Sequence, residues 1–354
     1  MWGNMKYKLP VFCGLFFMSV VNMACAERGS FDLDRWDSVI QNIRNKAITE
    51  NISYSVIDSA LKSPVFIPGI VKSDRNQSEF KLTLEQYLKR TVSDERIKSG
   101  KKQRATYPTL LSHVEKTYGV PRDVMLAFWG MESNYGKNKS KYQLTNAFIT
   151  LIYEGRREEF FSKQLIALMK IADKNKLQIN NIYGSWAGAM GHFQFIPTTL
   201  AQYGSDGNAD NRIDIINNIS DAMYSAGNYL NKLGWERGEP IAVRVILPAD
   251  FDKDLLNGDQ KKTLTEWTQM GVMQMDGTPV EPGDTVVGLV ADVKNIDKII
   301  ESQIDVNQTM DTDIAPTPVI HAYLTYPNFY RVKKWNNSSW YAIAISELSD
   351  KLKH

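Results

Sequence analysis

The sequence predicts a mainly α-helical protein of the α+β class with a small β region late in the chain. Apolar residues recur at helical spacing from Phe31 to about Trp235, and again from Ser339 to Leu352. After Pro240 the spacing changes to the alternation typical of a strand. With 354 residues, the chain is long enough to bury a substantial core in one large domain or in two to three smaller ones.

The composition excludes several classes of protein. It is 43% hydrophobic and 23% charged, which argues against a disordered chain, a collagen-like fibre and a multispanning membrane protein. The 42 basic and 40 acidic residues give a formal charge of +2 without a block of one sign, so nothing indicates a nucleic-acid partner. The four histidines form no His-Glu-x-x-His pair, which argues against a zinc hydrolase.

Residues 1–26 have the pattern of an export signal. Lys6 and Lys8 precede an apolar run, residues 9–21, that is too short to span a bilayer comfortably. A small-x-small site, residues 24–26, follows, so we expect cleavage after Ala26 and a periplasmic protein. A buried N-terminal helix is one alternative.

Lipidation at Cys25, which would give an outer-membrane lipoprotein, is the other alternative. Asn22 stands where a lipoprotein signal usually has Leu, which favours simple cleavage. Cleavage would remove both cysteines, Cys13 and Cys25, so the stability of the mature chain would depend on packing rather than on a disulfide. It would also remove Lys6 and Lys8 and bring the formal charge of +2 to zero.

The N-terminal region, residues 27–117, is predicted to be helical from two apolar stripes. The first stripe comprises Trp36, Ile40 and Ile43. The second comprises Leu82, Leu84, Tyr87 and Leu88. A loop is predicted between them at Pro64, Pro68 and Gly69.

Three further regions follow. Residues 118–240 are again helical, with glycines that interrupt the pattern. Residues 241–315 are the small β region: alternating apolar residues at 241, 243, 245 and 247 predict a strand, and turn sequences at 276–277 and 282–284 separate further short strands. Residues 316–354 form the C-terminal segment that completes the cleft, and helical spacing returns from Ser339 to Leu352.

Glu132 is the first candidate for a catalytic residue. It follows the continuously apolar run 124–131, which begins shortly after Pro121, a favourable first residue of a helix. Burial and the negative end of the helix dipole would both disfavour the charged carboxylate and raise its pKa. A carboxyl that is neutral at neutral pH can act as the general acid of a glycosidase. A buried Glu paired with an Arg, or a solvated Glu, remains an alternative to this interpretation.

Four motifs make the interpretation more specific. The first, Glu132-Ser-Asn-Tyr-Gly136, resembles the E-[ST]-x-[FY]-G motif of lytic transglycosylases with a lysozyme-like core. Residues 183–197 resemble their S-x-A-G-A-x-G-x-x-Q-F-x-P block. Residues 225–235 and 328–342 resemble two later segments. The order and spacing of the four motifs are similar to those of the membrane-bound lytic murein transglycosylase B family. The similarity runs from about Phe31 to the C-terminus. The region 118–240 would then be the catalytic core.

The resemblance implies a reaction and a set of partners. The family cleaves the β-1,4 bond between N-acetylmuramic acid (MurNAc) and N-acetylglucosamine (GlcNAc) in peptidoglycan, and the muramoyl 6-hydroxyl attacks C1 to close a 1,6-anhydro ring. Glu132 would be the single catalytic carboxyl, first as acid and then as base, instead of the usual pair. No cofactor is required. We expect peptidoglycan glycan strands, and other cell-wall enzymes, as partners of a monomer.

The same resemblance assigns residues of the substrate cleft. Ser185 and Gln194 would be polar contacts, and Asn336 would lie near the acid. The aromatic residues around the sugars would be Tyr87, Phe195, Tyr229 and Tyr341. Arg156 and Arg157 resemble an arginine pair that lines the cleft, although a solvated helix face shared with the glutamates that follow is an equal alternative. Trp335 stands where the family usually has Tyr, which keeps a stacking face but changes the hydrogen bond.

Residues 206–214 resemble a calcium loop. Oxygen-bearing residues occupy positions 1, 3, 5 and 9 of an EF-hand pattern, with a backbone carbonyl at position 7. The usual Gly and Glu of positions 6 and 12 are replaced by Asn211 and Asn217. Together with a later Asp that the family implies, the candidate ligands are Asp206, Asn208, Asp210, Arg212 and Asp221. A weak calcium site and a plain surface loop both remain open.

Three other functions compete with a lytic transglycosylase. One of them, a calcium-sensing module, is disfavoured by the missing Glu at position 12 of the loop. A hydrolytic muramidase would have the same fold and would use water in place of the 6-hydroxyl. A catalytically silent peptidoglycan-binding protein would need no acid, and the presence of Glu132 disfavours it.

Overall fold

The computed structural model describes residues 31–353, apart from 77–81, 139, 299, 302 and 304–317. The predicted export signal, with Cys13 and Cys25, lies outside the described residues. The α-helices are α1 (Leu33–Thr49), α2 (Tyr54–Ala60), α3 (Pro68–Arg75), α4 (Leu84–Thr91), α5 (Asp94–Thr106), α6 (Pro108–Tyr118), α7 (Arg122–Ser133), α8 (Leu144–Glu154), α9 (Glu158–Asn175), α10 (Pro197–Tyr203), α11 (Ile219–Lys232), α12 (Leu264–Gln269), α14 (Pro327–Trp335) and α15 (Ser339–Leu352). The strands are β1 (Tyr142–Gln143), β2 (Tyr183–Gly184), β3 (Ala242–Pro248), β4 (Asn257–Thr263), β5 (Val286–Ala291) and β6 (Val319–Thr325).

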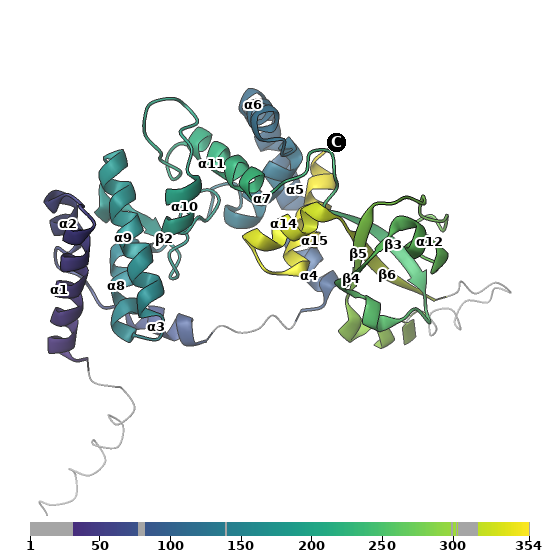
Figure 1. Cartoon of the computed structure of the whole chain (residues 1–354), viewed down its shortest axis with the longest axis horizontal. Coiled ribbons are helices and arrows are strands. Elements are labelled where there is room, and N and C mark those ends of the chain that lie inside the picture. The colour runs from purple at the N-terminus through teal and green to yellow at the C-terminus, as the bar shows by residue number, and fades with distance from the viewer. Residues whose placement is uncertain are drawn as a thin grey trace, which may run out of the picture.

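The predicted fold class is confirmed: helices make up most of the described chain, and the larger sheet is small. The molecule is elongated (Figure 1), with α1 and α2 at one end, α7, α14 and α15 near the middle, and the strands β3 to β6 with α12 at the other end. The helices other than α12 share one continuous hydrophobic core. This arrangement places the helix that carries Glu132 in the interior of the molecule.

Helix α7 is buried because its sequence is apolar on every side. Met125, Leu126 and Phe128 have no exposed surface, and α15 packs against this helix. The helix begins one residue later than the sequence suggests, because Pro121 is the residue before the first turn, with an extended ψ of 142°. It ends at Ser133, since the following Asn134 takes a left-handed conformation with φ 50°.

Helix α3 corrects one prediction. Pro68 and Gly69 were expected to lie in a loop, but they are the first two residues of this helix. A proline is well suited to the first turn, because its missing N–H would have no partner there and its φ is already helical. The predicted C-terminal helix, residues 339–352, has the expected bounds in α15.

The larger sheet has the strand order β3-β6-β5-β4, and all its pairs are antiparallel. Val245 pairs with Ala322, and Leu289 with Leu324, so that β6 lies in the middle of the sheet. The β region therefore extends to Thr325, past the boundary expected at residue 315. It has a hydrophobic core of its own, around the fully buried Trp267.

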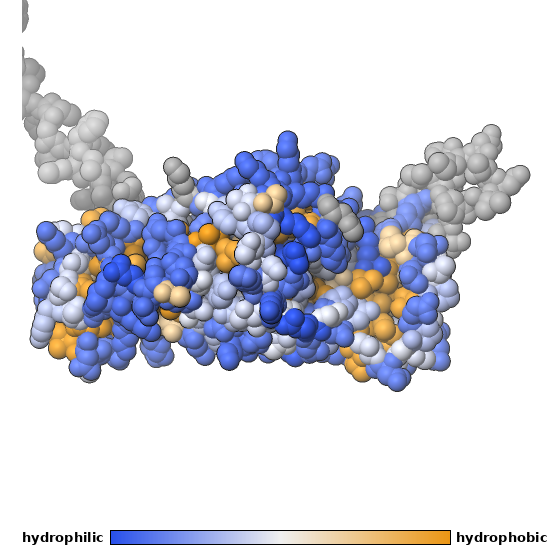
Figure 2. Space-filling view, turned by 90° about the horizontal axis from the view of Figure 1, so that it is seen from above, coloured by the Kyte–Doolittle hydropathy of each residue, from blue (hydrophilic) through white to orange (hydrophobic). Residues whose placement is uncertain are grey.

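The surface of the described chain is mixed. Seen from above, it is mostly hydrophilic, with apolar patches toward both ends of the molecule (Figure 2). Among the described residues, none of the helices combines the length and the apolar character needed to cross a membrane.

Candidate active site

Glu132 lies in the last turn of α7, where the apolar helix meets the surface. The burial of the carboxyl raises its pKa from 4.5 to about 7, and hydrogen bonds from Tyr341 and Trp335 counteract part of this shift. Near neutral pH, a substantial fraction of the protein therefore carries Glu132 in its neutral form. This confirms the expected direction of the shift, with desolvation as the main cause.

Two donors hold one oxygen of this carboxyl. Tyr341 Oη donates to Glu132 Oε1 at 2.5 Å, and Trp335 Nε1 donates to the same oxygen at 3.0 Å. Burial and the nearby Glu132 carboxylate raise the pKa of Tyr341 well above its usual value, so the phenol remains a donor. No hydrogen bond from a described residue reaches Oε2. The arrangement orients the carboxyl through Oε1 and leaves Oε2 available to a substrate.

The end of α14 and the start of α15 position these two donors. Trp335 is the last residue of α14, and its ring lies 4.9 Å from that of Phe128 on α7 and 5.0 Å from that of Tyr229, centroid to centroid. Ser338 caps α15 by accepting a hydrogen bond from the backbone N–H of Tyr341. Sequence reasoning noted Trp335 as a departure from the family pattern but did not place it among the site residues.

A groove with a cavity volume of about 320 Å³ opens beside Glu132. The described residues that line it are Glu132, Asn138, Ser140, Lys141, Tyr142, Gly184, Ser185, Trp186 and Gln194. The structure thus brings the predicted Ser185 and Gln194 together with Glu132. Their contact with a substrate stays a prediction.

The wall that carries Ser185 is a tight loop. The backbone N–H of Ser185 donates to the Ala189 carbonyl at 2.8 Å, and its hydroxyl accepts from the Ala189 N–H at 3.1 Å. Gly188 has φ 95°, and a Cβ there would lie 2.3 Å from the ring of Phe148. The close approach and the left-handed backbone both require glycine at this position.

Of the predicted aromatic residues, Tyr341 donates directly to Glu132, and the other three lie around this contact. Phe195 and Tyr229 pack against Trp335, with ring centroids 5.4 and 5.0 Å away, and so support the hydrogen bond to Glu132 from behind. Tyr87 lies on α4, and burial together with the charge of the nearby Glu132 carboxylate raises its pKa. Asn336 is exposed, and no hydrogen bond among the described residues joins it to Glu132, whereas its neighbour Trp335 makes that contact.

Arg156 and Arg157 both bind the carboxylate of Asp74. The side chain of Asp74 is only 1% exposed. Burial raises its pKa, but the hydrogen bonds from the two arginines outweigh that effect and lower it below the usual value. The glutamates that follow in the sequence do not pair with these arginines in the described chain, so a helix face shared with them is not what the structure shows. A contact between the arginines and a substrate stays a prediction.

The loop at residues 206–221 is closed by its own hydrogen bonds. Asp206 accepts from the backbone N–H groups of residues 208–211, and the buried Asp221 accepts from those of Gly207 and Asp214. The side-chain nitrogen of Asn208 donates to the Asp210 carboxylate, and its oxygen accepts from the Asp210 backbone N–H. Arg212 donates its backbone N–H to the same carboxylate. The described residues include no group of three or more His, Cys, Asp or Glu placed to hold a metal. Calcium binding at this loop therefore stays a prediction.

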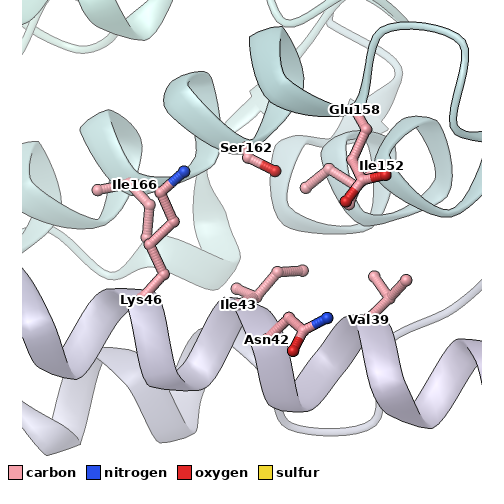
Figure 3. A pocket seen from close by; sticks show the side chains of 8 residues that line it. All are labelled: Val39, Asn42, Ile43, Lys46, Ile152, Glu158, Ser162 and Ile166. Carbon is pink, nitrogen blue, oxygen red and sulfur yellow. The ribbon is translucent and has the colours of Figure 1, made fainter.

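A second, smaller pocket lies between α1, α8 and α9 (Figure 3). Its cavity volume is about 130 Å³, and Lys46 from α1 and Glu158 from α9 line it without forming an ion pair. It contains none of the motif residues. The groove beside Glu132 is therefore the candidate active site.

Comparison with known proteins identifies a family and a relative that this chain resembles. Residues 35–350 match the family described as the transglycosylase SLT domain. The membrane-bound lytic murein transglycosylase B of Escherichia coli (strain K12) is 27% identical over 264 residues, which is 74% of this chain and 65% of that protein. The aligned part thus spans slightly less than two thirds of that relative.

Two solved structures are similar throughout. SltB3 from Pseudomonas aeruginosa, solved in complex with NAG-NAM-pentapeptide, is 34% identical with a TM-score of 0.79, covering 90% of this chain and 79% of that one. The Escherichia coli lytic transglycosylase Slt35, solved in complex with calcium, is 23% identical with a TM-score of 0.71, covering 89% and 92%. The second likeness shows a shared fold.

Proposed function

Because this chain belongs to the transglycosylase SLT domain family, we propose that it is a lytic transglycosylase that cleaves the β-1,4 MurNAc–GlcNAc bond of peptidoglycan and leaves a 1,6-anhydroMurNAc end. The observation that carries the proposal is the Glu132 carboxyl, with its pKa near 7, held through one oxygen at the edge of a groove.

Glu132 would act twice. In the first step, the protonated carboxyl donates its proton from Oε2 to the glycosidic oxygen, and the bond to the leaving GlcNAc breaks. In the second step, the resulting carboxylate takes the proton of the muramoyl 6-hydroxyl as that oxygen bonds to C1. The protons balance, and the acid is regenerated. Since the nucleophile belongs to the substrate, its effective concentration is high without a positioned water.

The composition of the groove supports this route over hydrolysis. Glycosidases that use water normally have a second carboxylate, either as a nucleophile or to activate the water. Among the described lining residues, Glu132 is the only carboxylate. A hydrolytic muramidase on this scaffold would therefore lack the usual base.

Analysis of the products tests the proposal. Purified sacculi digested with the wild-type protein should release muropeptides that are about 18 Da lighter than the hydrolytic products, because ring closure replaces the addition of water. Mass spectrometry before and after borohydride reduction provides the measurement, since anhydro ends resist reduction. Reducible ends would show that the protein is a hydrolytic muramidase. An absence of products would show that it is a catalytically silent binding protein.

We also propose the periplasm as the location and glycan strands as the partner, because peptidoglycan is the proposed substrate. SltB3 was solved with NAG-NAM-pentapeptide, and we expect the same class of ligand to bind here. The export signal and other cell-wall enzymes as partners remain predictions from the sequence.

Calcium is not required for the proposed reaction. None of the candidate calcium ligands is among the described residues that line the groove beside Glu132, so the loop takes no part in the proposed proton transfers. We expect a chelator such as EGTA to leave the rate of sacculus cleavage unchanged, and 1 mM calcium to raise Tm by no more than about 2 °C, as for a weak ligand near its Kd. A large loss of cleavage on chelation, restored by calcium, would contradict this.

A further inference from the structure

Lys141 is the one charged residue other than Glu132 among the described residues that line the groove. It forms no ion pair with a described residue, and the residue is exposed. A cation in a groove whose acid is about half neutral at pH 7 gives the site a positive character near neutral pH.

The backbone fixes Lys141 relative to the catalytic wall. Its N–H donates to the Gly184 carbonyl at 3.2 Å, and the next residue, Tyr142, pairs with Gly184 across the β1–β2 ladder. Gly184 directly precedes Ser185, which lines the same groove. The position of the lysine along the groove is therefore set by the strand register, while its flexible stem leaves the ammonium group free to reach a ligand.

We propose that Lys141 determines substrate specificity by binding a carboxylate of the stem peptide on the muramoyl residue that is placed at Glu132. The proposal rests on the function proposed above. MurNAc differs from GlcNAc by its lactyl ether, which carries the stem peptide and its carboxylates, so a single unpaired cation can distinguish the two sugars. Arg156 and Arg157 are less able to do so, because the buried Asp74 already binds both.

A binding measurement that does not depend on turnover tests this inference. Isothermal titration of NAG-NAM-pentapeptide would be carried out in the Glu132→Gln background, with Lys141 intact, Lys141→Met and Lys141→Arg. A chito-oligosaccharide of GlcNAc units, which has no carboxylate, is the second ligand. Lys137→Met is the matched control, because Lys137 is a nearby lysine that donates to the Ser99 hydroxyl and does not line the groove.

We expect Lys141→Met to weaken binding of the pentapeptide ligand about tenfold, as for the loss of one hydrogen-bonded charge. Binding of the chito-oligosaccharide should not change, Lys141→Arg should retain most of the affinity, and Lys137→Met should have no effect. Unchanged pentapeptide binding, an equal loss for both ligands, or no measurable binding with Lys141 intact would each overturn the inference.

The two proposals can fail separately. If the wild-type protein gives anhydro products but Lys141→Met binds the pentapeptide ligand normally, only the role of Lys141 is wrong. If Lys141→Met loses binding selectively but the wild-type products are reducible, the reaction is wrong and the specificity of the groove stands.

Discussion

Glu132→Gln should reduce the cleavage of sacculi by about 100- to 10,000-fold, the range expected when general acid–base catalysis is lost. The amide keeps the size and shape of the side chain, and its oxygen can still accept from Tyr341 and Trp335. It cannot donate a proton to the glycosidic oxygen or accept one from the 6-hydroxyl. Release of soluble muropeptides over time, followed by chromatography, is the measurement. Full-speed digestion by this variant would eliminate Glu132 as the acid.

Glu132→Gln should make the folded protein more stable than the wild type at high pH. A loss of activity in this variant would then not be due to unfolding. The pKa of Glu132 is 4.5 in the reference state and about 7 in the folded protein, so the folded state holds the proton more tightly. The wild type therefore loses stability relative to the variant as the pH rises from 4.5 to 7, and the difference reaches about 3 kcal/mol above pH 7. Urea unfolding of both proteins at pH 4.5 and pH 8 measures it. A difference that does not depend on pH would mean that the carboxyl titrates normally.

Tyr341→Phe should lower turnover at the optimum by about 10- to 100-fold, the cost of removing one hydrogen bond to a charged group. The phenol donates to Oε1 at 2.5 Å and stabilises the carboxylate that forms after the first proton transfer. The phenylalanine ring keeps the edge-on packing against Phe128. We therefore expect a functional loss with little change in the fold.

The pH profile distinguishes this role from simple packing. The first step needs protonated Glu132, so wild-type kcat/KM should fall as the pH rises through about 7. Without the Tyr341 hydroxyl, the carboxylate loses a donor, its pKa rises further, and the fall should move to higher pH. Tyr224→Phe is the control, because Tyr224 packs on Tyr118, and no contact in the described chain links it to Glu132. A lower rate with an unmoved pH profile would show that Tyr341 only fills space.

Much of the site was predictable because its signals are local. The apolar run before Glu132 predicts a buried helix with a carboxyl at its end, and α7 has that form. Periodicity likewise predicted α15 to the residue. Gly188 belongs to the motif at residues 183–197, whose small residues are visible in the sequence. The structure shows that close packing requires glycine at this position.

Other features depend on residues that are far apart in the chain. Trp335 and Tyr341 reach Glu132 across 203 and 209 residues, and Asp74 meets Arg156 across 82. The substitution of Trp for Tyr at position 335 could have drawn attention to the first contact, and the motif already placed Tyr341 in the cleft. No local pattern signalled the contact between Asp74 and Arg156. The place of β6 in the middle of its sheet was equally hidden, because strand order depends on long-range pairing.

Residue types and their spacing were therefore enough to specify the helices and to locate a carboxyl in an apolar segment, since both follow from side-chain chemistry over a few turns. Packing decided which oxygen of that carboxyl accepts hydrogen bonds. It also decided that Arg156 and Arg157 are neutralised by Asp74, while Lys141 stays available in the groove. The physical reason is that hydrogen bonds and ion pairs act over a few ångströms in space, and only the folded arrangement of α7, α14 and α15 brings those partners within reach.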